Sequence, residues 1–219
     1  MNYPEDYRSP TKSLREYRDQ TRLRGCEIMR AVVVEFPGIE VFHLHGPYIS
    51  EPETPGYVTR DQVGFWRGHE LHGPFFAGFV EAAGSRARVI DGGEVYQYRS
   101  AHDFRASYRW RKNGMASSTT DCAFIPPALR RSWQNRVDIS FGVYNQSWPD
   151  PDNDRMNPAI ARRTLTNALR RCDTYVWFYA ERDDWLVEGG VSRGWVEAVR
   201  RARLDARNRP QPVVAPAAP

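Results

Sequence analysis

The feature of this sequence that most constrains its fold is a repeated alternation between short apolar runs and longer segments of helical pattern. Four runs have the composition of buried strands, and they lie at residues 39–44, 87–90, 137–144 and 174–179. A helical pattern precedes the first run and follows each of the four. Strands that alternate with helices are typical of parallel β-α units. The sequence therefore predicts an α/β fold with four parallel strands.

Several of the helical segments carry recognisable start and stop signals. Ser13 and Glu16 have the spacing of a capping box, and Pro37-Gly38 ends the helix that follows. Gly73-Pro74 is expected to break the second helix. The helices are expected at residues 13–35, 59–83, 100–112, 158–172 and 192–207, with a short one after Pro126-Pro127.

Length and composition are those of one globular domain. The chain has 219 residues, 41% of them hydrophobic and 26% charged, which is enough to bury a substantial core. The folded part is expected over residues 13–208, between an irregular segment at 1–12 and a Pro/Ala-rich tail at 209–219 that is expected to be disordered. The sequence has no apolar run of membrane-spanning length and no N-terminal signal segment. We therefore expect the chain as given to be cytoplasmic, with an upstream signal missing only if the chain is truncated.

The chain has a net charge of +4, and almost all of its basic residues are arginines. The sequence holds two lysines, so arginine supplies 29 of the 31 basic residues. The 27 acidic residues are interspersed among them, which favours a compositional origin over a nucleic-acid-binding surface. The three cysteines are isolated from one another and from any histidine at metal-ligand spacing. No metal site and no cofactor is predicted.

Two of the apolar runs end in carboxylates. Asp91-Gly-Gly-Glu94 follows the second expected strand, and Glu181 ends the fourth. The C-terminal ends of parallel strands line the active sites of α/β barrels, so this placement indicates chemistry. Glu181 follows an almost wholly apolar strand, and a raised pKa suited to a general acid is expected for it. The alternatives are solvated acids at a Gly-Gly turn and an ion pair between Glu181 and an arginine.

Other residues near the same strand ends suit sugar recognition, because aromatic faces stack on sugars while amides and imidazoles bind hydroxyl groups. His43 and His45 alternate along the first strand, and both are therefore expected on one side of it. Structural histidines and a Trp148 that anchors a loop are the alternative interpretations. The predicted substrate-binding residues are His43, His45, Tyr96, Tyr98, Asn145 and Trp148.

Three longer motifs carry a resemblance to a known family. They are Arg24-Gly-Cys-Glu27 leading to Glu35-Phe-Pro-Gly-Ile39, Phe75–Ala83 leading to Arg88–Glu94, and Arg171–Glu181. With these motifs the chain resembles the C-terminal half of a bacterial family of uncharacterised, glycoside-hydrolase-like TIM barrels. The resemblance spans residues 13–205, and the two carboxylate motifs are its most specific parts.

The resemblance implies half of a TIM barrel that hydrolyses a glycosidic bond with two carboxylates and without a cofactor. Glu181 would be the acid/base, and Glu94 or Asp91 would be the nucleophile or the water-activating base. The N-terminal strands of such barrels, where many of these enzymes keep an additional catalytic carboxylate, have no counterpart here. Four parallel strands also leave two open edges, so pairing with a second copy or with another chain is expected.

Two other classes of function stay open at this point. A non-catalytic carbohydrate-binding or scaffold fragment of a larger barrel would use the same strand-end residues without cleaving the sugar. The segment at residues 99–112 interleaves arginines with aromatic residues, as nucleic-acid-binding surfaces do. An amphipathic helix that covers the sheet explains that segment more simply, so nucleic acid is the least favoured partner.

Overall fold

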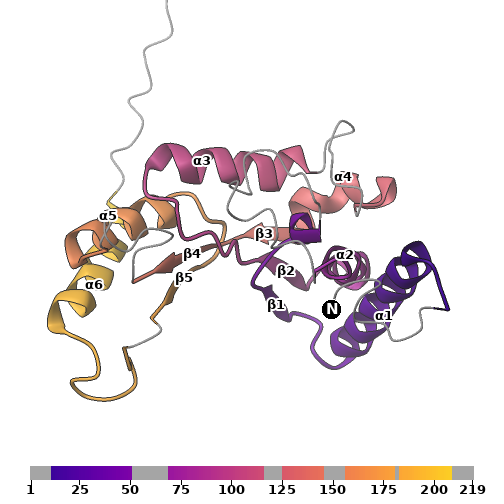
Figure 1. Ribbon diagram of the computed structural model, residues 1–219, viewed down its shortest axis with the longest axis horizontal. Helices are drawn as coiled ribbons and strands as arrows, with labels where there is room; N and C mark the ends of the chain where they lie inside the picture. The colour runs from indigo at the N-terminus through magenta and orange to yellow at the C-terminus, as the bar shows by residue number, and fades with distance from the viewer. Residues whose placement is uncertain (1–10, 51–68, 116–124, 146–155, 181–182, 209–219) are drawn as a thin grey trace, which may run out of the picture.

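The computed structural model describes residues 11–50, 69–115, 125–145, 156–180 and 183–208, and within them every paired strand runs parallel to its neighbour. One sheet has the order β1 (Glu40–His43), β2 (Arg88–Asp91), β3 (Val137–Ile139), and a second sheet pairs β4 (Phe141–Tyr144) with β5 (Val176–Tyr179). The two small sheets lie side by side in the molecule (Figure 1). The predicted α/β class with parallel strands is confirmed.

The single strand predicted over residues 137–144 is divided at Ser140. The Ser140 amide still donates to the Asp91 carbonyl of β2, at 2.8 Å. Its own carbonyl, however, accepts from Arg111 Nη1 at 2.8 Å. An arginine side chain thus takes the place of a strand amide at Ser140, between β3 and β4, and the Gly142 amide beyond it again donates to a backbone carbonyl, that of Gly93, at 3.1 Å.

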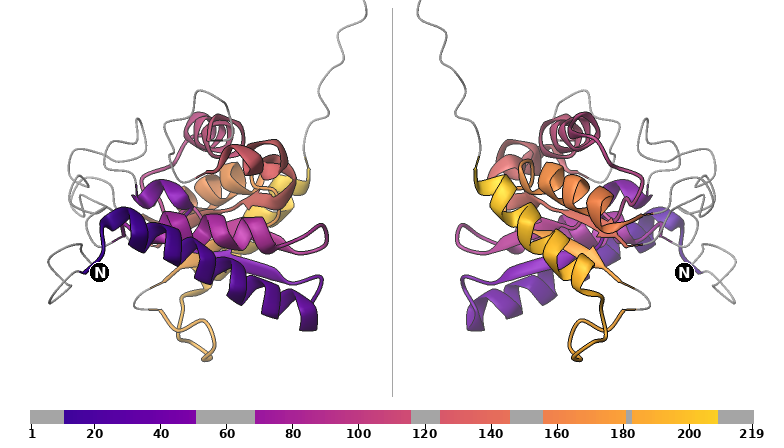
Figure 2. Two further views of the ribbon diagram at one scale, coloured as in Figure 1. Left: turned by 90° about the vertical axis from the view of Figure 1, so that its right-hand side faces the viewer. Right: turned by 90° about the vertical axis from the view of Figure 1, so that its left-hand side faces the viewer.

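Helices flank the strands at both ends of the molecule. They are α1 (Leu14–Glu35), α2 (His72–Ala82), α3 (Ala101–Arg109), α4 (Pro127–Arg136), α5 (Pro158–Leu169) and α6 (Arg193–Arg207), with a 3₁₀ turn η1 (Pro47–Ser50) and a π-helical turn η3 (Trp110–Gly114). Figure 2 shows α1 beside α2, and α5 beside α6. None of the described helices is long and apolar enough to cross a membrane.

The predicted capping box at the start of α1 is confirmed. The Ser13 hydroxyl accepts from the Glu16 amide, and the Glu16 carboxylate accepts from the Ser13 amide at 2.8 Å. The expected break at Gly73-Pro74 is wrong, because both residues lie in the first turn of α2. A proline there displaces no hydrogen bond, since the first amides of a helix have no partner one turn earlier. Residues 59–68 of the predicted helix lie outside the described residues.

Close approach of backbones holds α1 against α2. A Cβ atom at Gly78 would lie 2.2 Å from the carbonyl oxygen of Arg22, and one at Gly25 would lie 2.5 Å from that of Phe75. Any side chain at either glycine would therefore force the two helices apart. The Arg24-Gly-Cys-Glu27 motif thus has a packing role at its glycine.

The core lies on the side of the strands that the helices cover. Alternate strand residues such as Val89, Ile139 and Val143 are buried there, with Phe104 of α3 and Trp133 of α4. The intervening residues point to the opposite side, which we call the open face. There Phe42, Leu44, Tyr175 and Tyr179 are 39–51% exposed, whereas Ile90 and Gly142 are buried. This alternation follows from strand geometry, in which successive side chains point to opposite sides.

Candidate functional site

The turn after β2 brings Glu94 beside His45. The Gly92 amide donates to the His43 carbonyl at 2.7 Å, and the Glu94 amide donates to the Leu44 carbonyl at 3.1 Å. The two backbone segments therefore continue side by side past the ends of β1 and β2. Gly93 has a φ of 58°, a left-handed conformation that favours glycine.

Glu94 accepts two side-chain hydrogen bonds at this position. The His45 Nε2 atom lies 2.9 Å from Glu94 Oε2, and the Tyr96 hydroxyl donates to Glu94 Oε1 at 2.6 Å. These hydrogen bonds, that of His45 above all, lower the pKa of Glu94 below its ordinary 4.5 although burial acts against them. The carboxylate is consequently ionised at neutral pH, and its side chain keeps 26% of its surface exposed.

Three tyrosines form an aromatic cluster next to Glu94. The rings of Tyr96 and Tyr144 have centroids 5.1 Å apart, and those of Tyr144 and Tyr179 are stacked at 5.1 Å. Tyr144 ends β4 and Tyr179 ends β5, so paired strands hold both rings in register. Trp177 adds an edge contact to Tyr96 at 5.9 Å. Burial raises the pKa of Tyr96 well above its ordinary value, so its hydroxyl remains a hydrogen-bond donor.

Asn145 continues the cluster beyond β4. Its amide donates to the Tyr179 carbonyl at 3.0 Å, and its side-chain Nδ2 donates to Asp183. The Asn145 Oδ1 atom is buried and accepts no hydrogen bond from any described residue. The sequence analysis did not single out Asp183. It predicted a role for Glu181 instead, because that carboxylate ends the apolar run.

Asp91 has a different environment from Glu94. It is 1% exposed, and its carboxylate accepts from Arg111 Nε at 2.7 Å and lies 2.5 Å from Arg111 Nη2. The Tyr48 hydroxyl and the Gly93 amide donate to its Oδ1 atom, at 2.9 and 3.1 Å. These partners enclose the carboxylate on the helix-covered side. We therefore assign Asp91 a structural role and leave it out of the candidate site.

The two predicted strand histidines occupy different surroundings. His45 joins Glu94, whereas the His43 ring packs against Phe76 and Phe79 of α2, with centroids 5.0 and 5.1 Å away. Burial lowers the pKa of His43 to about 4. The sequence analysis did not single out the neighbouring His72, whose ring centroid lies 5.9 Å from that of His43. His43 is thus part of an aromatic group under α2 and is not brought to Glu94.

The remaining predicted residues have mixed outcomes. Tyr98 is directed toward the core, where its ring meets Phe104 edge-on at 5.8 Å. Trp148 and Glu181 lie outside the described residues. Within the described parts of the chain, no group of three or more metal-ligating side chains comes together. The structure therefore gathers Glu94, His45, Tyr96 and Asn145 from the sequence prediction. Tyr144, which ends the same predicted strand as Asn145, joins them, and the structure adds Tyr179 and Asp183.

The arginine-rich segment at residues 99–112 has an exposed side with Arg105 and Arg109 and a side that turns inward. Arg111 is fully buried beside Asp91, and Arg99 Nη1 donates to the carbonyls of Tyr96 and Tyr98. Phe104 is likewise buried, in the core under α3. The segment therefore packs as a helix that covers the strands, as the simpler interpretation predicted.

Comparison of this chain with known protein families, curated proteins and solved structures finds no match.

Proposed function

We propose that this protein binds a carbohydrate at the C-terminal ends of β2, β4 and β5 and hydrolyses a glycosidic bond there. The observation that carries the proposal is the ionised, partly exposed Glu94 carboxylate beside the aromatic cluster of Tyr96, Tyr144 and Tyr179. Glycosidases act with carboxylates that flank the scissile bond, and ring faces stack on the apolar faces of sugars.

Several polar groups around the cluster suit hydroxyl recognition. The Asn145 Oδ1 atom, which accepts no hydrogen bond from a described residue, can accept one from a sugar hydroxyl. A bound hydroxyl would remove the free-energy cost of that buried acceptor. Tyr179 is 39% exposed and offers both a ring and a hydroxyl. An apolar surface with a few converging polar groups is typical of small-molecule sites.

The lowered pKa of Glu94 assigns it one of the two carboxylate roles. A group that is ionised at neutral pH acts as the nucleophile or as the water-activating base, whereas the acid must carry a proton. We assign the acid to Glu181, two residues before Asp183 in the chain. Carboxyl groups about 5–5.5 Å apart would give retention, and a separation of roughly 6.5–9.5 Å would give inversion.

The fold proposal that goes with this function is half of a (β/α)8 barrel. The strands follow their order along the chain from β1 to β3 and from β4 to β5, as consecutive barrel strands do. The Tyr175 hydroxyl, just before β5, donates to the Glu40 carboxylate of β1 across the open face, which supports a curved arrangement of strands. In this proposal the edges of β1 and β5 are covered by a second copy or by another chain.

The test is hydrolysis of a panel of aryl glycosides and oligosaccharides by Glu94→Gln. Turnover should fall by about 10²–10⁴-fold, the range that acid–base and nucleophilic groups contribute, with the melting temperature preserved. Glu27→Gln, which removes a carboxylate paired with Arg24 on the exposed side of α1, is the matched control and should leave turnover unchanged. Equal turnover in Glu94→Gln and the parent protein would refute the assignment.

A non-catalytic carbohydrate-binding protein is the second candidate. The two hydrogen bonds that Glu94 accepts from His45 and Tyr96 favour this function, because a carboxylate held in place is also a good acceptor for sugar hydroxyls. Saturable binding of an oligosaccharide by calorimetry, without release of reducing ends by the parent protein, would select this function. Loss of that binding in Glu94→Gln would still locate the site.

A further inference from the structure

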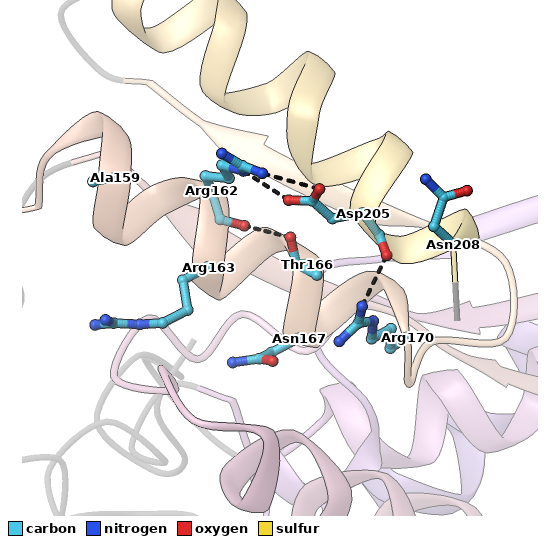
Figure 3. A pocket seen from close by; sticks show the side chains of 8 residues that line it. All are labelled: Ala159, Arg162, Arg163, Thr166, Asn167, Arg170, Asp205 and Asn208. Atoms are coloured by element: carbon cyan, nitrogen blue, oxygen red, sulfur yellow. Dashed lines mark hydrogen bonds and ion pairs between the residues drawn. The ribbon is translucent and has the colours of Figure 1, made fainter. Parts of the chain in front are cut away.

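A groove between α5 and α6 lies apart from the site described above. Its volume is about 430 Å³, within the range of small-molecule sites. Figure 3 shows the side chains that line it, and several of them carry guanidinium or amide groups. The lining residues are Ala159, Arg162, Arg163, Thr166, Asn167, Arg170, Asp205 and Asn208.

This pair of helices concentrates the positive charge of the molecule. Residues 158–171 and 193–207 contain nine arginines against two carboxylates, a net charge of +7 where the whole chain carries +4. The rest of the chain is therefore net acidic. A local excess of this size raises the concentration of anions at the surface, and the groove is where that surface is concave.

One arginine in the groove is held in a fixed orientation. Arg162 donates from Nε to Asp205 Oδ2 at 2.7 Å and from Nη2 to Asp205 Oδ1 at 3.0 Å. A guanidinium has five N–H groups, and this pairing uses two of them along one edge. The opposite edge keeps the fork geometry that matches two oxygens of a phosphate. Asp205 therefore orients Arg162 without consuming its capacity to bind an anion.

Two further arginines lie along one side of α5. Arg163, Asn167 and Arg170 are spaced by four and three residues, so they share a face of the helix. Arg170 Nη2 donates to the Asp205 carbonyl at 2.8 Å, which anchors it near the end of α6. Arg163 is exposed and makes no ion pair with a described residue, and in Figure 3 it extends away from Asp205.

We propose that the groove between α5 and α6 binds the phosphate groups of a small organic phosphate or polyphosphate. The lining supplies guanidinium and amide donors, which recognise phosphate oxygens, and contains no aromatic ring on which a nucleobase would stack. A compact phosphate ligand is therefore favoured over a single-stranded nucleic acid. The proposal does not depend on sugar hydrolysis at Glu94.

The test uses the full chain and inorganic pyrophosphate as the probe, titrated by calorimetry at physiological salt. The expected result is saturable 1:1 binding that Arg163→Gln weakens about tenfold, the loss expected for one charge-assisted contact of about 1.4 kcal/mol. Arg200→Gln removes the same charge from the same helix pair but outside the groove, where Arg200 pairs with Glu197. It should change the affinity by less than twofold.

Three results would overturn the proposal. The first is no binding of pyrophosphate to the parent protein under these conditions. The second is an equal loss of pyrophosphate affinity in Arg163→Gln and Arg200→Gln, which is the behaviour of diffuse attraction. The third is tighter binding of a single-stranded oligonucleotide than of pyrophosphate, with a steep dependence on salt, which would assign the basic face to nucleic acid. Unchanged melting temperatures of both variants are the control for folding.

Discussion

Asp91 and Glu94 are three residues apart at the end of the same strand, yet they face opposite environments. Asp91 points to the helix-covered side, where Arg111 and Tyr48 enclose it at 1% exposure. Glu94 lies beyond the turn, 26% exposed, with His45 and Tyr96 as partners. The same motif thus supplies one carboxylate to the core and one to the candidate site.

The difference between them teaches that partner type and burial decide what a strand-end carboxylate can do. The Arg111 guanidinium stays charged at every accessible pH, so its ion pair with Asp91 always compensates the charge of that carboxylate. The partners of Glu94 are a histidine and a phenol, which hold the carboxylate in place and leave part of it open to a ligand. The two histidines at the end of β1 and just beyond it repeat the contrast, with His43 packed under α2 and His45 beside Glu94.

The largest expected effect comes from breaking the buried pair. Arg111→Met leaves the Asp91 carboxylate without its cation and should lower the free energy of unfolding by about 3–5 kcal/mol, measured by chemical denaturation. Arg109→Met removes an exposed arginine from the same segment and should cost less than about 0.5 kcal/mol. Should Glu94→Gln destabilise the protein as much as Arg111→Met, the contrast between the two carboxylates would be lost.

Acid should destabilise the helix-covered side through His43. Burial lowers its pKa to about 4, so between pH 6.5 and 4 the unfolded chain binds a proton that the folded chain does not. Stability therefore falls as the pH drops through this window, by up to about 3 kcal/mol at roughly 1.36 kcal/mol per pH unit. The lowered pKa of His72 acts in the same direction.

His43→Phe is the variant that isolates this effect. Its unfolding free energy should vary less between pH 6.5 and 4 than that of the parent protein, because one titrating group has been removed. Denaturant midpoints measured across the window provide the comparison. An unchanged slope would mean that the acid sensitivity arises elsewhere in the molecule.

Gly93 lies between the two carboxylates, so a substitution there tests the turn that separates the buried Asp91 from the partly exposed Glu94. Gly93→Ala places a methyl group in a left-handed conformation, 2.3 Å from Arg111 Nη1. Gly84 also has a positive φ, of 70°, but has nothing within 4 Å of its Cβ position. Gly84→Ala should therefore lower the free energy of unfolding only through the strain of a left-handed alanine, by about 1–2 kcal/mol. Gly93→Ala should lower it by more, because the added methyl group also meets Arg111. Equal melting temperatures would show that Arg111 can move away freely.

The smallest expected effect concerns the aromatic cluster. Tyr179→Ala should weaken oligosaccharide binding by about 0.5–1.5 kcal/mol, the value of one aromatic contact, measured by calorimetry. Tyr175→Ala removes a tyrosine that directly precedes the same strand, is 45% exposed and is hydrogen-bonded to Glu40. This variant should leave the affinity unchanged. Equal losses in the two variants would place the sugar on the open face as a whole.

Much of the local structure could be predicted from the sequence because local interactions determine it. The capping box of Ser13 and Glu16 needs only one turn of backbone, and the expected start of α1 is confirmed. The parallel strands were predicted from apolar runs, because strands such as β2 and β4 bury consecutive residues on both of their sides. The break expected at Gly73-Pro74 was wrong since a proline in the first turn of a helix is tolerated.

The sequence by itself determined the strand and helix alternation, the parallel α/β class and the carboxylates placed after β2. Only the tertiary structure decided which carboxylate is buried, because Arg111 is 20 residues from Asp91 in the chain and reaches it from η3. The division at Ser140 and the meeting of His45 with Glu94 likewise depend on contacts between separate elements. Periodicity reports which side of a strand is apolar, whereas the identity of the group that faces a carboxylate depends on how distant segments pack.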